Sequence, residues 1–140
     1  GGVEGTVLEI GLFGTAINTP DNVKTIVGNS KVMNGDIKNY SANGFRRVEL
    51  VAQMAGSADV HKAIALLKEA VAAVPNRANN TGVDVEILEF NEFGPKLAVR
   101  PYCHTDHYWQ VYFDTNKAIA DTLGAAGFPV ATRPVKVYPV

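Results

Sequence analysis

Apolar and polar residues alternate with a period of two along the first third of the chain. One face of the first run consists of Thr6, Leu8, Ile10 and Leu12. Such alternation is typical of a pleated strand, whose successive side chains point to opposite faces. Further strands are expected at residues 15–18, 23–27 and 37–41, because turn-forming Pro, Gly, Asn and Asp residues separate them. No helix is expected in this part.

The pattern changes after residues 42–44, where Ala-Asn-Gly marks a domain boundary. One face of the next predicted strand consists of Val48, Leu50, Ala52 and Met54. Ser57 or Asp59 is expected to cap a helix that follows, because either side chain can accept from a free backbone N–H. Apolar positions then recur at steps of three and four, which predicts one buried helical stripe. The stripe consists of Val60, Ile64, Leu67, Val71 and Val74.

The remaining residues predict two strands, a second helix and a last strand. The strands are expected at residues 83–87 and 97–103, and the helix at residues 107–123, ended by Gly127. Its expected inner face consists of Trp109, Tyr112, Asn116, Ile119 and Leu123. Val135 and Val137 alternate with polar positions in a final strand over residues 134–138. The order from residue 45 onward is β-α-β-β-α-β, the ferredoxin-like pattern.

Two domains are therefore predicted, residues 1–44 and residues 45–140, and they differ in how well each can form a hydrophobic core of its own. The second can bury two helices against one face of a sheet. The first is so short that its own core is marginal, and its strand edges need partners. Packing against identical copies in a closed ring would meet both needs, although this reasoning leaves the number of subunits open.

Composition and charge favour some classes of protein over others. Hydrophobic residues make up 46% of the chain and charged residues 19%, which is typical of a folded globular protein. The net charge is -1, and no basic stripe is present to neutralise a phosphate backbone, so we expect no nucleic-acid partner. No apolar run approaches the roughly 20 residues that a membrane-spanning helix needs. The chain lacks an initiating Met and is expected to be a fragment of a longer protein.

The segment Cys103-His104-Thr105-Asp106-His107 carries the most chemically suggestive side chains. A metal site or a cysteine nucleophile beside a histidine would use these residue types. Structural zinc, however, needs ligands from two separated pairs, and the only other histidine is His61. Helix capping by Thr105 or Asp106 explains the same residues, so we expect no catalytic residue, no metal and no cofactor.

Two further groups of residues have a functional and a structural interpretation. Arg46 and Arg47, at the predicted domain junction, would attract anions to an opening, or else form surface ion pairs such as one with Glu49. The aromatic residues of the second helix would stack on a ligand, or else belong to the core. Their helical spacing favours the core. These residues are Tyr108, Trp109, Tyr112 and Phe113.

Nine short segments follow one another along the chain in a defined order: 5–13 (GTVLEIGLF), 19–22 (TPDN), 27–31 (VGNSK), 37–41 (IKNYS), 46–49 (RRVE), 58–60 (ADV), 100–102 (RPY), 108–114 (YWQVYFD) and 125–129 (AAGFP). This ordered set resembles the family of small-conductance mechanosensitive channels. No single motif decides the resemblance, which rests on their order and spacing over essentially the whole chain.

The resemblance implies a non-enzymatic vestibule on the cytoplasmic face of the inner membrane. In such channels a small Sm-like β domain forms a collar below the pore and a ferredoxin-like domain forms the walls. The copies associate as a heptamer, and the last strand, here Val135 and Val137, joins a barrel between subunits. Ions and small solutes pass through side openings, where Arg46 and Arg47 are expected, during the response to osmotic down-shock. Contact with the membrane is expected only through helices upstream of a soluble fragment.

Two alternative hypotheses belong to other classes of protein. A ring-forming RNA-binding protein would use a similar short β domain, although the neutral charge argues against it. A small metalloenzyme would use residues 103–107.

Overall fold

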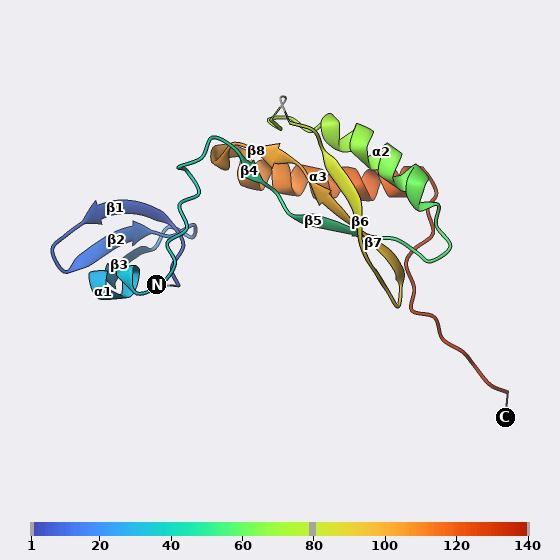
Figure 1. The fold of residues 1–140 in the computed structure, drawn as a ribbon, viewed down its shortest axis with the longest axis horizontal. Helices are drawn as coiled ribbons and strands as arrows, with labels where there is room; N and C mark the ends of the chain where they lie inside the picture. Colours follow the sequence, from blue (N-terminus) through green and yellow to red (C-terminus); the bar gives the residue numbers. More distant parts are fainter. Residues whose placement is uncertain (1, 79–80, 140) are drawn as a thin grey trace. The chain divides into compact units, whose positions relative to one another are not determined.

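The computed structural model describes residues 2–78 and 81–139. The chain divides into two compact units, Gly1–Asn39 and Tyr40–Val140, so the division lies slightly before the boundary expected at residues 42–44. Figure 1 shows the first unit in blue and the second in green to red.

The first unit is a three-stranded antiparallel sheet in the order β1-β2-β3, followed by one short helix. Its elements are β1 (Thr6–Ile10), β2 (Gly14–Asn18), β3 (Lys24–Gly28) and α1 (Asn29–Met33). The three predicted strands in residues 6–27 are confirmed. The turn between β2 and β3 is closed by Thr19, whose hydroxyl accepts from the Val23 N–H at 3.1 Å, while Asn22 adopts a left-handed φ of 63°.

Two expectations for this unit are wrong. Residues 29–33 form α1 rather than a simple turn, and residues 37–41 form no strand. Distant contacts hold Asn29, the first residue of α1, because its side-chain amide donates to the carbonyls of Gly11 at 2.9 Å and Leu12 at 3.2 Å. Its carbonyl oxygen accepts from the Thr15 hydroxyl at 2.7 Å. Bonds to residues so distant in sequence carry no local signal.

The second unit contains a three-stranded sheet, a two-stranded pair and two long helices. Its elements are β4 (Arg46–Arg47), β5 (Leu50–Gln53), α2 (Val60–Ala72), β6 (Asp84–Asn91), β7 (Gly94–Arg100), β8 (Tyr102–Cys103), a 3₁₀ turn (Thr105–His107) and α3 (Tyr108–Ala125). The sheet order is β5-β7-β6, with both pairs antiparallel, and β4 pairs with β8. Helix α2 contacts α3 and β6, and α3 contacts β5 (Figure 1).

The core of the second unit lies between the sheet and the helices. The predicted face of β5 is confirmed, since Val48, Leu50, Ala52 and Met54 are all buried. Asp59 caps α2 as expected, accepting from the Lys62 N–H at 3.2 Å. The largest fully buried side chains of the core include Met54, Leu67, Leu97, Val71, Val85, Val99 and Val111.

Gly127 ends α3 as predicted. It has a φ of +74°, and its N–H donates to Gly124 O while that of Phe128 donates to Leu123 O, both at 3.1 Å. This paired arrangement is a Schellman motif, in which a left-handed glycine satisfies the last helical carbonyls. The strand predicted over residues 134–138 is absent, and the segment after α3 leaves the helix without pairing (Figure 1). That prediction is wrong for the single chain.

Candidate functional site

The first unit exposes most of its large apolar side chains. Of its described residues only Thr15, Ala16 and Val27 are buried. Strand β1 is exposed on both faces, because the neighbouring residues Val7 and Leu8 are 54% and 56% exposed. The other exposed large apolar residues of the unit are Val3, Ile10, Leu12, Phe13, Val23, Ile26, Met33 and Ile37. A sheet with so small a core offers a large surface to a partner.

The aromatic residues of α3 differ from the expected core. The residues of α3 that are buried are Val111, Thr115 and Ile119, whereas Trp109 and Phe113 are 55% and 63% exposed and Asn116 is exposed. The predicted inner face is therefore wrong at Trp109 and Asn116, and the expectation of a core role is wrong for Phe113. Tyr108 and Tyr112 do pack against the core, partly buried. Trp109 stacks on Phe113 at 5.9 Å between ring centroids, one turn apart.

The extended end of the second unit also exposes apolar residues. Val135 and Val137 are 77% and 83% exposed, and Tyr138 lies open as well. These side chains have the alternation of a strand but no neighbouring strand in the single chain.

Arg46 and Arg47 are adjacent in β4 but have different partners. The guanidinium of Arg46 lies over two rings, 4.0 Å from the centroid of Tyr40 and 3.7 Å from that of Tyr108. Arg47 instead forms an ion pair with Glu49 through a hydrogen bond that raises the pKa of the arginine. The expected ion pair with Glu49 is thus confirmed for Arg47.

Glu49 joins a second arginine to this cluster. Its other carboxylate oxygen lies 2.8 Å from Nε of Arg100, without the alignment of a hydrogen bond. Two arginines on one carboxylate leave a net positive charge beside β4, on side chains that are partly exposed. Such a cluster can bias the local distribution of ions.

Residues 103–107 form a helix start rather than a cluster of ligands. Cys103 is fully buried, and burial raises the pKa of its thiol, an effect that the nearby charge of Arg46 partly offsets. His104, and not Thr105 or Asp106, caps the 3₁₀ turn, since its Nδ1 accepts from the Asp106 N–H at 3.1 Å, and His107 precedes α3 without a side-chain cap bond. Throughout residues 2–78 and 81–139, no three His, Cys, Asp or Glu side chains gather where a metal ion could bind.

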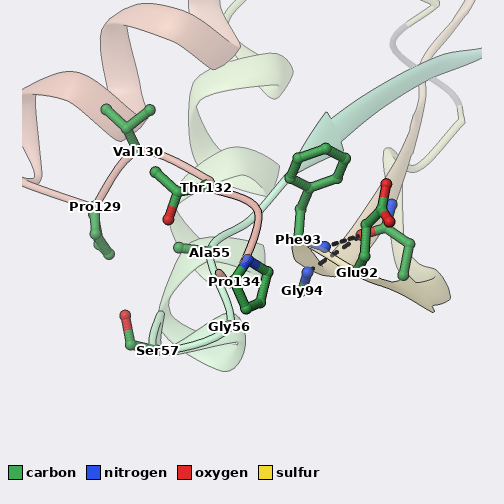
Figure 2. A pocket seen from close by; sticks show the side chains of 11 residues that line it. Ala55, Gly56, Ser57, Glu92, Phe93, Gly94, Pro129, Val130, Thr132 and Pro134 are labelled. Atoms are coloured by element: carbon green, nitrogen blue, oxygen red, sulfur yellow. Dashed lines mark hydrogen bonds between the residues drawn. The ribbon is translucent and has the colours of Figure 1, made fainter. Parts of the chain in front are cut away.

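An open pocket of about 470 Å³ lies within the second unit, and Figure 2 shows its lining. Three segments line it, residues 55–57, 91–94 and 129–134. Glu92 is the charged residue among the described lining residues, and it pairs at 2.7 Å with Arg133, which is not itself part of the lining. The pocket therefore offers no unpaired charge that would identify a ligand.

Sequence reasoning missed the roles of Tyr40, Thr105 and Arg133. The Thr105 hydroxyl donates to the backbone carbonyl of Tyr40, and Arg133 ties the segment after α3 to the β6–β7 turn. Each contact joins residues far apart in sequence, so the sequence offered no signal beyond the residue types themselves. Among the helices of the described chain, none combines the length and hydropathy needed to cross a bilayer.

Comparisons with known proteins agree with one another. Residues 1–42 match the model of the mechanosensitive ion channel β-domain. A small-conductance mechanosensitive channel from Edwardsiella ictaluri is 31% identical over 140 residues, covering 99% of this chain and 49% of the relative. A protein of the MscS family from Buchnera aphidicola is 31% identical over 112 residues, covering 80% of this chain and 40% of that protein. The chain thus spans about half the length of these relatives or less.

Solved structures show the same fold. The crystal structure of Helicobacter pylori MscS in its closed state matches with a TM-score of 0.89 at 19% identity, covering 99% of this chain and 55% of that one. The cryo-EM structure of Arabidopsis thaliana MSL1 matches with a TM-score of 0.71 at 16% identity, covering 94% and 50%. At these identities the likeness describes a mixed α and β fold.

Proposed function

This chain belongs to the family of small-conductance mechanosensitive channels, and on that premise we propose that it forms the vestibule of such a channel. In the proposal the copies make a heptameric ring on the cytoplasmic face of the inner membrane. Ions and small solutes pass through the ring when membrane tension opens the pore after osmotic down-shock. Gating belongs to membrane helices outside residues 1–140. The chain itself is non-enzymatic, binds no cofactor and takes no nucleic acid.

The two units have separate tasks in this proposal. A Sm-like β domain, residues 1–44, forms the collar below the pore, and a ferredoxin-like domain, residues 45–140, forms the walls. The strand order β5-β7-β6 leaves an edge of β5 where the last strand of a ferredoxin-like sheet would lie. Residues 134–138 become a strand only in the ring, where Val135 and Val137 contact neighbouring copies.

The observation that carries the proposal is the exposed apolar surface of β1–β3 and α1. Burial is worth about 25 cal/mol per Å² of apolar surface, so a partner that covers these side chains would stabilise the unit. The same side chains lie on the segment that matches the channel β-domain. Copies of the chain supply an apolar partner of the same shape at every position of a closed ring.

Arg46 and Arg47 are proposed to line the side openings. Arg47, Glu49 and Arg100 leave one net positive charge there, which attracts anions weakly because exposed charges are screened by salt.

A graft tests the proposed function directly. Residues 1–140 would replace the matching half of the Edwardsiella ictaluri channel, and excised membrane patches would be recorded under suction. We expect tension-gated currents and survival of the host cells after down-shock. A graft that reaches the membrane as an assembled ring but shows no tension-gated current would contradict the proposal.

Two matched variants test whether assembly of the ring depends on the exposed apolar side chains of the first unit. Ile26→Asp places a charge on an apolar side chain that is 72% exposed, so the second unit and the fold of the single chain should tolerate it. We expect it to prevent assembly. Lys24→Asp, on the same strand at an exposed polar position, serves as the control and should assemble.

A further inference from the structure

Arg46 is the middle layer of a three-layer stack. Its guanidinium lies between the ring of Tyr40, at 4.0 Å, and the ring of Tyr108, at 3.7 Å. Tyr40 comes from the segment that precedes β4, Arg46 from β4 itself and Tyr108 from the first residue of α3. A cation that faces a ring on both sides gains two cation–π contacts, and it loses water from both faces.

The backbone of Tyr40 is held as well as its ring. The Thr105 hydroxyl donates a hydrogen bond to the carbonyl of Tyr40. Two contacts therefore fix Tyr40 to the start of α3. Arg46 links its ring to the ring of Tyr108, and the Thr105 hydroxyl holds its backbone carbonyl. Arg46 is fixed independently, because its backbone pairs with that of Cys103 in β8.

We propose that Tyr40, Arg46 and Tyr108 form a latch that fastens the segment connecting the two units onto the second unit. With the latch closed, the ring of Tyr40 is held on the second unit. With it open, that ring is released, while the backbone pairing of Arg46 with Cys103 stays in place. The latch is a conformational device that does not depend on the ring.

Trypsin cleavage after Lys38 reports the state of this latch in the 140-residue chain. A protease must bind several residues on both sides of the cleaved bond in extended form, and Tyr40 lies within that stretch. Tyr40→Leu and Arg46→Gln should each release the fragment ending at Lys38 about tenfold faster, as expected for loss of a partly desolvated cation–π contact. The double variant should be no faster than the faster single variant, because both changes open the same latch.

Three controls separate the latch from general loosening. Tyr40→Phe keeps the ring and the backbone carbonyl, so its cleavage rate should equal that of the unchanged chain. Arg47→Gln removes the adjacent positive charge, which pairs with Glu49 and not with the two rings. It should also leave the rate of cleavage after Lys38 unchanged. Cleavage after Lys117, inside α3, reports unfolding of the second unit and should stay slow in every variant.

The proposal would be overturned by unchanged cleavage at Lys38 in Tyr40→Leu, by an equal rise in Arg47→Gln, or by a parallel rise at Lys117. Additive rates in the double variant would also overturn it. If Arg46→Gln does not fold, the comparison of Tyr40→Leu with Tyr40→Phe decides alone.

Discussion

A Cβ atom on Gly94 would lie 2.6 Å from the backbone nitrogen of Gly56. It would also lie 2.7 Å from the carbonyl oxygen of Met54, and Gly94 has a φ of +136°. The start of β7 therefore approaches the end of β5 backbone to backbone. Asn91 holds the turn in this position, because its side-chain oxygen accepts from the N–H groups of Phe93 at 2.9 Å and Gly94 at 3.2 Å (Figure 2).

Gly94→Ala should therefore lower the free energy of unfolding by about 2–4 kcal/mol, since it combines backbone strain with a clash against backbone atoms. Thermal unfolding followed by far-ultraviolet circular dichroism measures the change. Gly124→Ala is the control, because Gly124 lies in α3 with open space at its Cβ position. Alanine there should raise stability by up to about 1 kcal/mol through helix propensity. Equal effects of the two substitutions would contradict the geometry.

Because of the face that α3 buries, truncating a smaller side chain should cost more stability than truncating a larger one. Val111→Ala should cost about 2 kcal/mol, because Val111 is fully buried and its truncation leaves a cavity. Phe113→Ala, although it removes a larger side chain, should cost less than about 0.5 kcal/mol in the single chain, because Phe113 is mostly exposed. Urea unfolding of monomeric samples compares the two. A larger loss in the free energy of unfolding for Phe113→Ala than for Val111→Ala would contradict this expectation and support the aromatic core that the sequence predicted.

Cys103 should be unreactive in the folded chain. Burial raises the pKa of its thiol, so at pH 8 the native protein should react with a thiol reagent at least about a hundredfold more slowly than the unfolded chain. Arg46→Gln should raise the pKa further, because the nearby positive charge favours the thiolate. Rapid labelling without denaturant would show that the thiol is accessible.

The same pKa shift gives a pH dependence of stability. The folded-state pKa of Cys103 is raised, so the unfolded chain releases its proton first as pH rises. The stabilisation is complete below the ordinary thiol pKa, about 8.5, and is lost as pH rises through the folded-state pKa. Cys103→Ala should therefore show a flatter stability curve above pH 8 than the unchanged chain, and identical slopes would contradict the assignment.

Sequence patterns predicted the elements whose signals are local. The alternation of Val48, Leu50, Ala52 and Met54 defines a buried face that the structure confirms, and Asp59 and Gly127 mark helix ends by side-chain and backbone chemistry that operates within one turn. The family resemblance is likewise confirmed, since residues 1–42 match the channel β-domain and a small-conductance mechanosensitive channel is 31% identical over 140 residues.

The missed features depend on contacts between distant residues. Asn29, the first residue of α1, bonds to Gly11 and Leu12. The proposed latch depends on Arg46 lying over the rings of both Tyr40 and Tyr108. The inner face of α3 was misplaced because helical spacing alone allows more than one stripe. The structure buries Val111, Thr115 and Ile119, which are also helically spaced, in place of the stripe that begins at Trp109. Residues 134–138 have the alternation of a strand, but a strand forms only by pairing, and within the described residues this segment pairs with none.

The most direct test of the account measures amide exchange of residues 6–28 across a range of protein concentrations, with sedimentation velocity on the same samples. If the β unit completes its packing with copies of itself, exchange in these residues should slow as a larger closed species forms, while exchange in α2 stays constant. A chain that sediments as a monomer at every concentration, with residues 6–28 as strongly protected as the core of the second unit, would contradict the account.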